Sequence, residues 1–225
     1  MNLSLRLKTV ASFVKRGSRL ADIGTDHGYI PIYLVKEGVI NEAIAMDINK
    51  GPLERAQENI RKAGLEDQIS IRLSDGLDKL LPGEADSIII AGMGGMLIKD
   101  ILKRGLEVIK NTGELILSPH SDLAEVRNFL SEEGLNIIHE EMLIDEGKYY
   151  VIIKAFYTGE KYFLNPEEAA FGKILLEEKN NVLYNWLLNE KTKKEKILDG
   201  LNEKNAARSL ETSLELIRKG LKIYG

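Results

Sequence analysis

Short apolar runs alternate with longer helical patterns along the first 133 residues, and this alternation is the feature that most limits the fold. We expect strands where the runs are rich in apolar and β-branched residues, and helices between them. Repeated strand–helix units form a parallel sheet with right-handed crossovers. The predicted strands are residues 19–23, 42–48, 68–74, 86–91 and 114–118, and the predicted helices are residues 27–36, 51–63, 96–110 and 121–133.

The alternation ends with two strand-like runs, residues 136–144 and 149–157, joined by Asp145-Glu146-Gly147-Lys148. A glycine-containing turn between two such runs is typical of a β-hairpin. The hairpin adds one antiparallel strand to the parallel sheet. The sequence therefore predicts a doubly wound α/β sheet with an antiparallel last strand, whereas a plain dinucleotide-binding fold more often continues with a sixth parallel strand.

A helical segment follows the sheet. Residues 159–165 have the composition of a linker, and from Pro166 onward the pattern is helical. Apolar residues spaced four, three and four apart form one stripe in the last helix, at Leu210, Leu214, Ile217 and Leu221. We expect two antiparallel helices that bend near Gly200 and Asn202. The predicted domains are residues 1–158, a catalytic sheet, and residues 159–225, a helical hairpin.

Composition excludes several classes of protein. The chain has no cysteine, which excludes disulfide scaffolds, thiolate metal sites and cysteine nucleophiles, and we expect no metal. No apolar run approaches the length of a membrane span, and residues 1–15 lack the continuous apolar core of a secretory signal. We therefore expect a soluble cytoplasmic protein with no membrane partner.

The charges are unevenly distributed. The net charge is −4, yet residues 1–20 carry Arg6, Lys8, Lys15, Arg16 and Arg19 and no acidic residue. From residue 161 onward basic residues also outnumber acidic ones, which leaves the middle of the chain strongly acidic. A polyanion would be attracted to the two ends. Solvated helix faces are the alternative explanation of the same pattern.

The first predicted strand ends in Asp22-Ile23-Gly24-Thr25-Asp26-His27-Gly28-Tyr29. An acid, one residue and a glycine at a strand-to-helix turn form the cofactor loop of many α/β folds, because glycine allows close approach of the backbone. Asp26 replaces the middle glycine of the dinucleotide pattern, and its carboxylate would repel a pyrophosphate. It would tolerate the ammonium of a bound amino acid, so the loop favours S-adenosylmethionine over NAD.

Three further strand ends carry candidate cofactor ligands. Asp47, followed by Ile48, can accept hydrogen bonds from ribose hydroxyls, although an acid that caps the next helix is an equal alternative. Ser74-Asp75-Gly76 places Asp75 where it can accept from an adenine amino group. Ala91-Gly92-Met93-Gly94 exposes bare backbone after an apolar strand. Because the carboxyl ends of parallel strands lie at one edge of a sheet, we expect these loops to form one pocket.

Longer motifs carry a resemblance to a known family. They are Leu3-Ser4-Leu5-Arg6-Leu7, the loop from Ala21 to His27, the run from Ile90 to Ile98, Leu115-Ile116-Leu117-Ser118-Pro119, and residues 140–150. With these motifs the chain resembles, over its whole length, the bacterial tRNA (adenine-N1)-methyltransferases that act on adenine 22 of the D-arm. The order of five strand–helix units and a hairpin is also that of the class I methyltransferase, or Rossmann-like, sheet. Two residues depart from the family: His120 stands where asparagine is usual, and Asp47 where glutamate is frequent.

The resemblance implies methyl transfer from S-adenosylmethionine to N1 of an adenine in tRNA. Asp26 is the first candidate to stabilise the cationic product or to bind the methionine ammonium. His27 either contacts the base or caps a helix, and Tyr29 either stacks on the base or packs beneath the loop. Arg6 and a lysine cluster are candidate RNA contacts: Lys191, Lys193, Lys194 and Lys196.

Other functions stay open at this point. The same sheet serves small-molecule and protein methyltransferases, and a non-catalytic cofactor-binding RNA module has the same motifs. The hairpin and its lysines can instead serve folding or dimerisation, and the sequence leaves open whether the protein is a monomer or a dimer.

Overall fold

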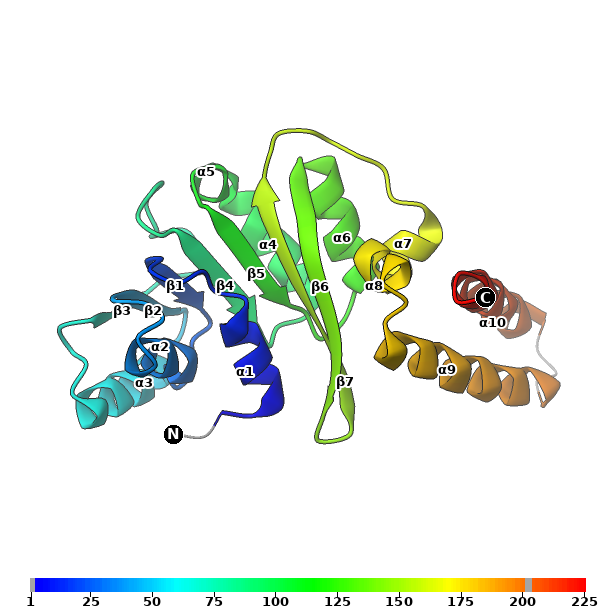
Figure 1. The fold of residues 1–225 in the computed structure, drawn as a ribbon, viewed down its shortest axis with the longest axis horizontal. Helices are drawn as coiled ribbons and strands as arrows, with labels where there is room; N and C mark the ends of the chain where they lie inside the picture. The colour runs from blue at the N-terminus through cyan, green and yellow to red at the C-terminus, as the bar shows by residue number, and fades with distance from the viewer. Residues whose placement is uncertain (1–2, 201–203) are drawn as a thin grey trace.

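The computed structural model describes residues 3–200 and 204–225, which form one mixed seven-stranded sheet with helices on both faces (Figure 1). The strand order is β3-β2-β1-β4-β5-β7-β6. All neighbouring pairs from β3 to β5 are parallel, and β7 is antiparallel to both β5 and β6. The strands are β1 Leu20–Ile23, β2 Ala43–Asp47, β3 Ile69–Leu73, β4 Ser87–Ala91, β5 Glu114–Ser118, β6 Leu135–Asp145 and β7 Lys148–Tyr157. This confirms the doubly wound sheet with an antiparallel last strand.

The two faces of the sheet have separate apolar cores. The N-terminal helices cover one face, and the helices that follow β4 and β5, with the C-terminal helices, cover the other. In β4, Ile88 and Ile90 belong to one core and Ile89 to the other, and all three are buried, as expected of a strand covered on both faces. The sheet-covering helices are α1 Leu5–Ser12, α2 Tyr29–Lys36, α3 Lys50–Ala63, α4 Gly95–Arg104, α5 Leu106–Lys110 and α6 Leu123–Glu132.

The helix predicted over residues 96–110 is wrong as a single element, because it is divided into α4 and α5 at Gly105. The Leu77 side chain packs where a Cβ on Gly105 would lie. This contact brings a loop close to the helix backbone, and only a residue without a side chain fits there. Periodicity does not report a break of this kind, since the apolar spacing continues across it.

The hairpin turn matches the prediction. Glu146 and Gly147 join β6 to β7, and both have positive φ, at 49° and 75°. Two consecutive left-handed residues form the turn whose twist suits a two-residue hairpin. Because β6 and β7 are longer than the parallel strands, the hairpin extends beyond the parallel part of the sheet.

The C-terminal segment contains more helices than the two predicted. It consists of α7 Pro166–Phe171, α8 Lys173–Glu177, α9 Asn181–Asp199 and α10 Lys204–Lys222. Gly172, with φ of 93°, separates α7 from α8, and Lys179, with φ of 52°, precedes the Asn180 cap of α9. These backbone conformations cannot continue a helix. Gly200 follows the end of α9 as predicted, whereas Asn202 lies outside the described residues.

The predicted antiparallel pair is formed by α9 and α10. Tyr224 donates to the Asn180 carbonyl (3.1 Å) near the start of α9, and Gly220 lies against Leu187 further along the same helix. Phe171, Leu187 and Ile217 belong to the core that also contains the buried residues of β4 and β5. The boundary at residue 158 stays a prediction: the architecture changes there, but the apolar side chains on its two sides form one continuous core.

Candidate active site

A cavity of about 320 Å³ opens at the carboxyl ends of β1 and β4. This is the point where the strand order changes direction, since β2 follows β1 on one side and β4 lies on the other. Ligands of doubly wound sheets bind at such switch points, and the volume is in the range of small-molecule pockets. The lining residues are Arg6, Leu7, Asp22, Gly24, Thr25, Asp26, His27, Tyr29, Ile30, Ala91, Gly92 and His120.

The loop after β1 forms the floor of the cavity. The Asp22 carboxylate is buried and accepts a hydrogen bond from the Thr25 hydroxyl (2.6 Å). Burial and, to a lesser extent, the neighbouring Asp47 raise the pKa of Asp22 to about 6, against the effect of the Thr25 bond. Gly24 has φ of 73°, and the Met93 side chain packs where its Cβ would lie. The loop therefore needs glycine at this position for its conformation and for its close packing.

Asp26 is held in a left-handed conformation, with φ of 51°, and is exposed at the rim of the cavity. Its two carboxylate oxygens lie 2.8 Å from Arg55 Nη2 of α3 and 3.3 Å from His27 Nε2. The His27 ring stacks on Tyr29, with centroids 4.9 Å apart and an interplanar angle of 9°. The three predicted catalytic residues are thus brought together, and Arg55 is a fourth member that the sequence did not indicate.

The opposite wall is built around Gly92, which has φ of 83°. The Arg6 Nη1 and His120 Cε1 atoms lie 3.7 Å and 4.0 Å from the position that a Cβ on Gly92 would take. The His120 N–H donates to the Met93 carbonyl (2.9 Å), which ties the loop after β5 to the loop after β4. Glycine at 92 therefore leaves room between the backbone and two polar side chains.

Arg6 is fixed in this wall by distant parts of the chain. Its N–H donates to the Asp145 carboxylate (3.0 Å), and its guanidinium lies over the Tyr150 ring, 5.2 Å from the centroid. Nη1 is buried and has no hydrogen-bond partner among the described residues. A buried donor without a partner costs roughly 1–3 kcal/mol, and more when it is charged. The cavity wall therefore contains a charged donor without a partner among the described residues.

Tyr150 is a wall residue that the sequence analysis missed as an individual site. It contacts Arg6 and also the His120 ring, with centroids 5.8 Å apart. It lies on β7, far along the chain from the glycine-rich loops. Only the run of matching residues 140–150 pointed to this part of the chain.

The remaining cofactor candidates lie at the same edge of the sheet but outside the cavity lining. Asp47 is buried and accepts from the Asn49 N–H (2.8 Å), while Ile48 is exposed. The Ser74 hydroxyl bonds the Gly76 carbonyl within its own turn (3.0 Å). Asp75 forms an ion pair with Arg104 of α4 (2.8 Å), so its carboxylate already has a cationic partner. Met93 packs on Gly24, and Gly94 precedes α4.

The four lysines predicted to contact RNA lie on α9. Lys193 forms an i,i+3 ion pair with Glu190 (2.9 Å). The same Glu190 and, more weakly, Tyr149 raise the pKa of Lys193. Both α1 and α9 contact β6. In Figure 1 the loop between β6 and β7 accordingly lies between α1 and α9.

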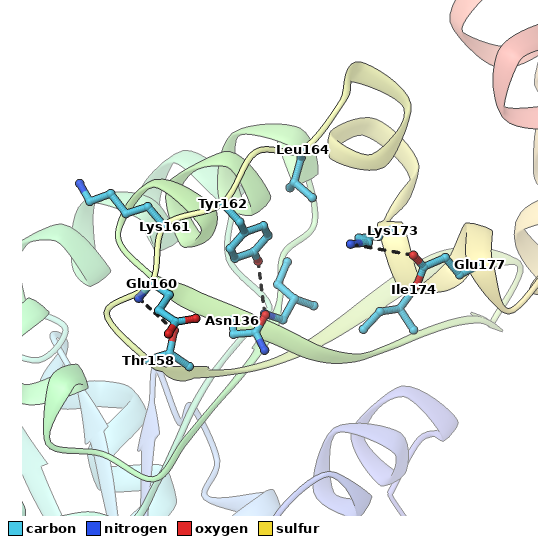
Figure 2. Close-up of a pocket in the computed structure, with 10 residues that line it drawn as sticks. Asn136, Thr158, Glu160, Lys161, Tyr162, Leu164, Lys173, Ile174 and Glu177 are labelled. Carbon is cyan, nitrogen blue, oxygen red and sulfur yellow. Dashed lines mark hydrogen bonds and ion pairs between the residues drawn. The ribbon is translucent and has the colours of Figure 1, made fainter.

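Another hollow, of about 400 Å³, lies at the opposite edge of the sheet, beside the start of β6. Figure 2 shows Tyr162 pointing toward the strand, where its hydroxyl accepts from the Ile137 N–H (3.3 Å). Lys173 faces Glu177 in the same view. None of the predicted site residues lines this hollow. Tyr162 attaches the linker to β6, since its hydroxyl also donates to the Leu135 carbonyl (3.3 Å).

Within residues 3–200 and 204–225, no helix is long and apolar enough to cross a bilayer. Among those residues, no three His, Cys, Asp or Glu side chains converge in a way that would hold a metal ion.

Comparison with known proteins gives consistent matches. Residues 3–153 match the family model described as methyltransferase domain. A curated relative, the tRNA (adenine(22)-N(1))-methyltransferase of Bacillus subtilis, is 41% identical over 155 residues, which are 69% of this chain and 65% of the relative. The match thus spans slightly less than two thirds of that relative's length.

Two solved structures are similar over 98% of this chain. The crystal structure of the B. subtilis M1A22 tRNA methyltransferase TrmK has 32% identity and a TM-score of 0.87, and 99% of that chain is covered. Sp1610 of Streptococcus pneumoniae, in complex with S-adenosyl-L-methionine, has 34% identity and a TM-score of 0.89, and all of that chain is covered.

Proposed function

The chain belongs to the tRNA (adenine(22)-N(1))-methyltransferase family of methyltransferase-domain proteins, and on this basis we propose that it transfers a methyl group from S-adenosylmethionine to N1 of adenine 22 in the tRNA D-arm. The cavity at the switch point of the sheet is the observation that carries the proposal. It combines a bare backbone floor, an acidic rim and an unpaired cationic donor in one place.

The residues of the cavity fit S-adenosylmethionine. Gly24 and Gly92 both have positive φ and border the cavity with bare backbone, which permits close approach of a ligand. Asp26 at the rim would repel a pyrophosphate but accommodates an ammonium. When bound, this cofactor supplies an electrophilic methyl group on a sulfonium. We assign its contacts to Asp22, Gly24, Thr25, Ala91 and Gly92, with Asp47 at the ribose.

The remaining strand-end residues complete the proposed cofactor site. Because they follow β2, β3 and β4 at the same edge of the sheet, we assign them to the adenosine part of the cofactor. The Ser74 hydroxyl bonds within its own turn. Asp75 accepts a hydrogen bond from the adenine amino group only when it gives up its ion pair with Arg104. The residues in this group are Ile48, Ser74, Asp75, Gly76, Met93 and Gly94.

The reaction depends mainly on the relative position of the adenine N1 and the methyl carbon. The N1 lone pair of adenine attacks the methyl carbon, the carbon–sulfur bond breaks, and its electron pair stays on sulfur. Holding N1 in line at about 3–3.5 Å lowers most of the barrier. The methylated base is cationic, so a nearby carboxylate favours the transition state. Asp26 is the carboxylate at the rim, held by Arg55 and beside the stacked pair of His27 and Tyr29.

In this proposal Arg6 contacts the RNA at the cavity, and the other contacts to tRNA lie outside it. Arg6 of α1 lines the cavity wall, and α9, which carries the lysine cluster, lies across the β6–β7 hairpin from α1 (Figure 1). A base in the D-arm has to leave its tertiary contacts before it can enter the cavity, which requires contacts to the rest of the RNA. We assign phosphate contacts to Lys191, Lys193, Lys194 and Lys196. A tRNA substrate also implies that the protein acts in the cytoplasm. We propose that it acts there as a monomer or a dimer.

Mass-spectrometric nucleoside analysis tests the proposal. A tRNA transcript with adenine at position 22 is incubated with the protein and S-adenosylmethionine, beside a transcript with guanine at that position. We expect 1-methyladenosine in the first transcript and none in the second. Tight cofactor binding without methylation of any RNA would support the non-catalytic module instead, and methylation of a protein or small molecule alone would support the other enzyme classes.

A further inference from the structure

The proposed reaction uses N1 of adenine, which leaves the opposite edge of the base, with N6 and N7, available for recognition. We propose that Arg6 and His120 together hold the target adenine by this Hoogsteen edge. The Arg6 Nη1 donates to N7, and an imidazole nitrogen of His120 accepts from the N6 amino group. This inference rests on the proposed function and adds to it the residues that select adenine.

The two side chains converge on one place in the cavity. Both line it, and the Arg6 Nη1 and His120 Cε1 atoms lie within 4.0 Å of the same point beside Gly92. N6 and N7 are neighbours on one edge of the purine, so one base can meet both groups. Tyr150 contacts both side chains and keeps them in position.

The donor is Arg6. Its Nη1 is buried without a partner among the described residues, and a guanidinium cannot lose its proton to relieve this. It requires an acceptor from the ligand. Purine N7 is an acceptor that arginine frequently contacts. The bond to Asp145 and the Tyr150 ring fix the rest of Arg6, so little freedom is lost when the base binds.

The acceptor is His120. Partial desolvation lowers the pKa of His120, and the cations Arg6 of α1 and Lys148 of β7 lower it further. The phenol of Tyr150, also on β7, is the other titratable group against its ring. At neutral pH the imidazole is therefore uncharged, and one of its nitrogens has a free lone pair. Guanine would present its O6 acceptor to that lone pair, so its binding requires the other tautomer of the imidazole.

The arrangement also explains how N1 is left unobstructed. Hydrogen bonds on N6 and N7 orient the purine without contact to its N1 lone pair. A competing assignment gives the Arg6 donor to the methionine carboxylate of the cofactor. The two assignments differ in what they predict for a substrate that lacks N7 and for cofactor affinity.

Full-length tRNA with a modified base at position 22 tests the clamp. One substrate carries 7-deazaadenosine, which lacks the N7 acceptor, and another carries purine riboside, which lacks the N6 amino group. Steady-state kcat/KM is measured for the parent protein and for Arg6→Met, His120→Leu and His120→Asn, with Arg61→Met on the exposed side of α3 as the control. Circular dichroism confirms that each variant is folded, and calorimetry measures its affinity for S-adenosylhomocysteine.

We expect 7-deazaadenosine to lower kcat/KM of the parent at least roughly tenfold, the scale of one charged hydrogen bond, and to leave Arg6→Met unaffected. Purine riboside should likewise lower kcat/KM of the parent but not that of His120→Leu. His120→Asn keeps an acceptor and should retain most activity. It should also lose the acid limb of the pH profile that protonation of His120 gives the parent.

Two results would overturn the clamp alone. The first is equal methylation of adenosine and 7-deazaadenosine by the parent. The second is a loss of cofactor affinity in Arg6→Met that matches its loss of kcat/KM, which would assign the donor to the methionine carboxylate. If the parent leaves unmodified tRNA unmethylated, the proposed function itself fails, and the two failures are thereby distinguished.

Discussion

Arg127 of α6 and Glu140 of β6 form a buried ion pair, in which Nε lies 2.8 Å from Oε1 and neither side chain is exposed by more than 1%. Two further atoms of the pair bond the C-terminal segment: Arg127 Nη1 donates to the carbonyls of Ala169 and Ala170, and Glu140 Oε2 accepts from the Ile174 N–H. Arg127 Nη2 has no hydrogen-bond partner among the described residues. Gly172 lies directly against both side chains. The pair therefore fastens α7 and α8 to the sheet.

Removing one partner of this pair should be costly. Arg127→Met leaves a buried carboxylate without its cation, and we expect a loss of about 3–5 kcal/mol in the free energy of unfolding, measured by urea denaturation. The double variant Arg127→Met/Glu140→Leu should be more stable than Arg127→Met. Lys62→Gln, which breaks an exposed pair on α3, is the control and should change little. Equal stability of Arg127→Met and the parent would show that the pair is not a fastening point.

Asp22 should make stability depend on pH. Its pKa is raised from 3.8 to about 6 in the folded protein, so the contribution of the protonated carboxyl is fully present below pH 3.8 and is lost as the pH rises through 6. Asp22→Asn does not ionise and keeps an acceptor for Thr25. Relative to the parent, it should gain stability between pH 4 and 7, by up to about 3 kcal/mol. Denaturation curves at several pH values measure this, and a difference that does not vary with pH would contradict it.

Asp26 should matter more for turnover than for cofactor binding. We expect Asp26→Ala to lower kcat far more than it weakens S-adenosylmethionine affinity, because its charge serves the cationic product. Arg55→Met keeps the carboxylate but removes the side chain that holds it, so its effect should be smaller and of the same kind. Kinetics and calorimetry on the two variants separate the roles. Equal losses of turnover and affinity in Asp26→Ala would assign this residue to the methionine ammonium.

Gly24→Ala should disturb the cofactor loop. A Cβ there meets the Met93 side chain, and the positive φ costs roughly 1–2 kcal/mol for a residue other than glycine. We expect weaker S-adenosylhomocysteine binding by calorimetry. Adding Met93→Ala relieves the clash but not the backbone strain, so it should restore binding only in part. Full restoration would show that packing alone requires the glycine.

The lysines of α9 should contribute to the salt dependence of tRNA binding. Replacing Lys191 and Lys194 by glutamine should lower the log–log slope of affinity against salt by roughly one for each lost phosphate contact. Lys36→Gln/Lys62→Gln, on α2 and α3, is a matched control with the same change in charge. Filter binding over a range of salt measures the slopes. Equal slopes for the two double variants would show that the lysines form a solvated helix face without phosphate contacts.

Deleting residues 160–225 is a poorer test of RNA binding than these charge replacements. Phe171, Leu187 and Ile217 are buried in the core that contains the sheet. Truncation would expose that core, so a loss of binding would not distinguish RNA contacts from a loss of folding.

The parallel sheet could be predicted because its signal is local. The run from Ile88 to Ile90 has the apolar continuity of a strand buried on both faces, and it lies on both cores. The breaks at Gly105 and Gly172 were not predicted, since contacts from outside the helices produce them. The Leu77 side chain packs against Gly105, and the Arg127–Glu140 pair packs against Gly172.

The site residues at the ends of strands could likewise be predicted from the sequence. Asp22 and Gly24 precede a helix at the end of a strand, and parallel topology brings the ends of strands to one edge. The engagement of Asp26 by Arg55 and of Arg6 by Tyr150 depends on how whole helices and the hairpin pack. No sequence period encodes such contacts, so they became visible only in three dimensions.

The bond between the Arg6 N–H and Asp145 joins positions 139 residues apart. During synthesis the first helix leaves the ribosome long before the hairpin that holds it, and pairing so distant in sequence forms late because the intervening loop has to close first. The cofactor loop after β1 can fold with its neighbours while the opposite wall is still missing. We therefore expect the wall around Arg6 to be completed only after the β6–β7 hairpin, which supplies Asp145 and Tyr150, has formed.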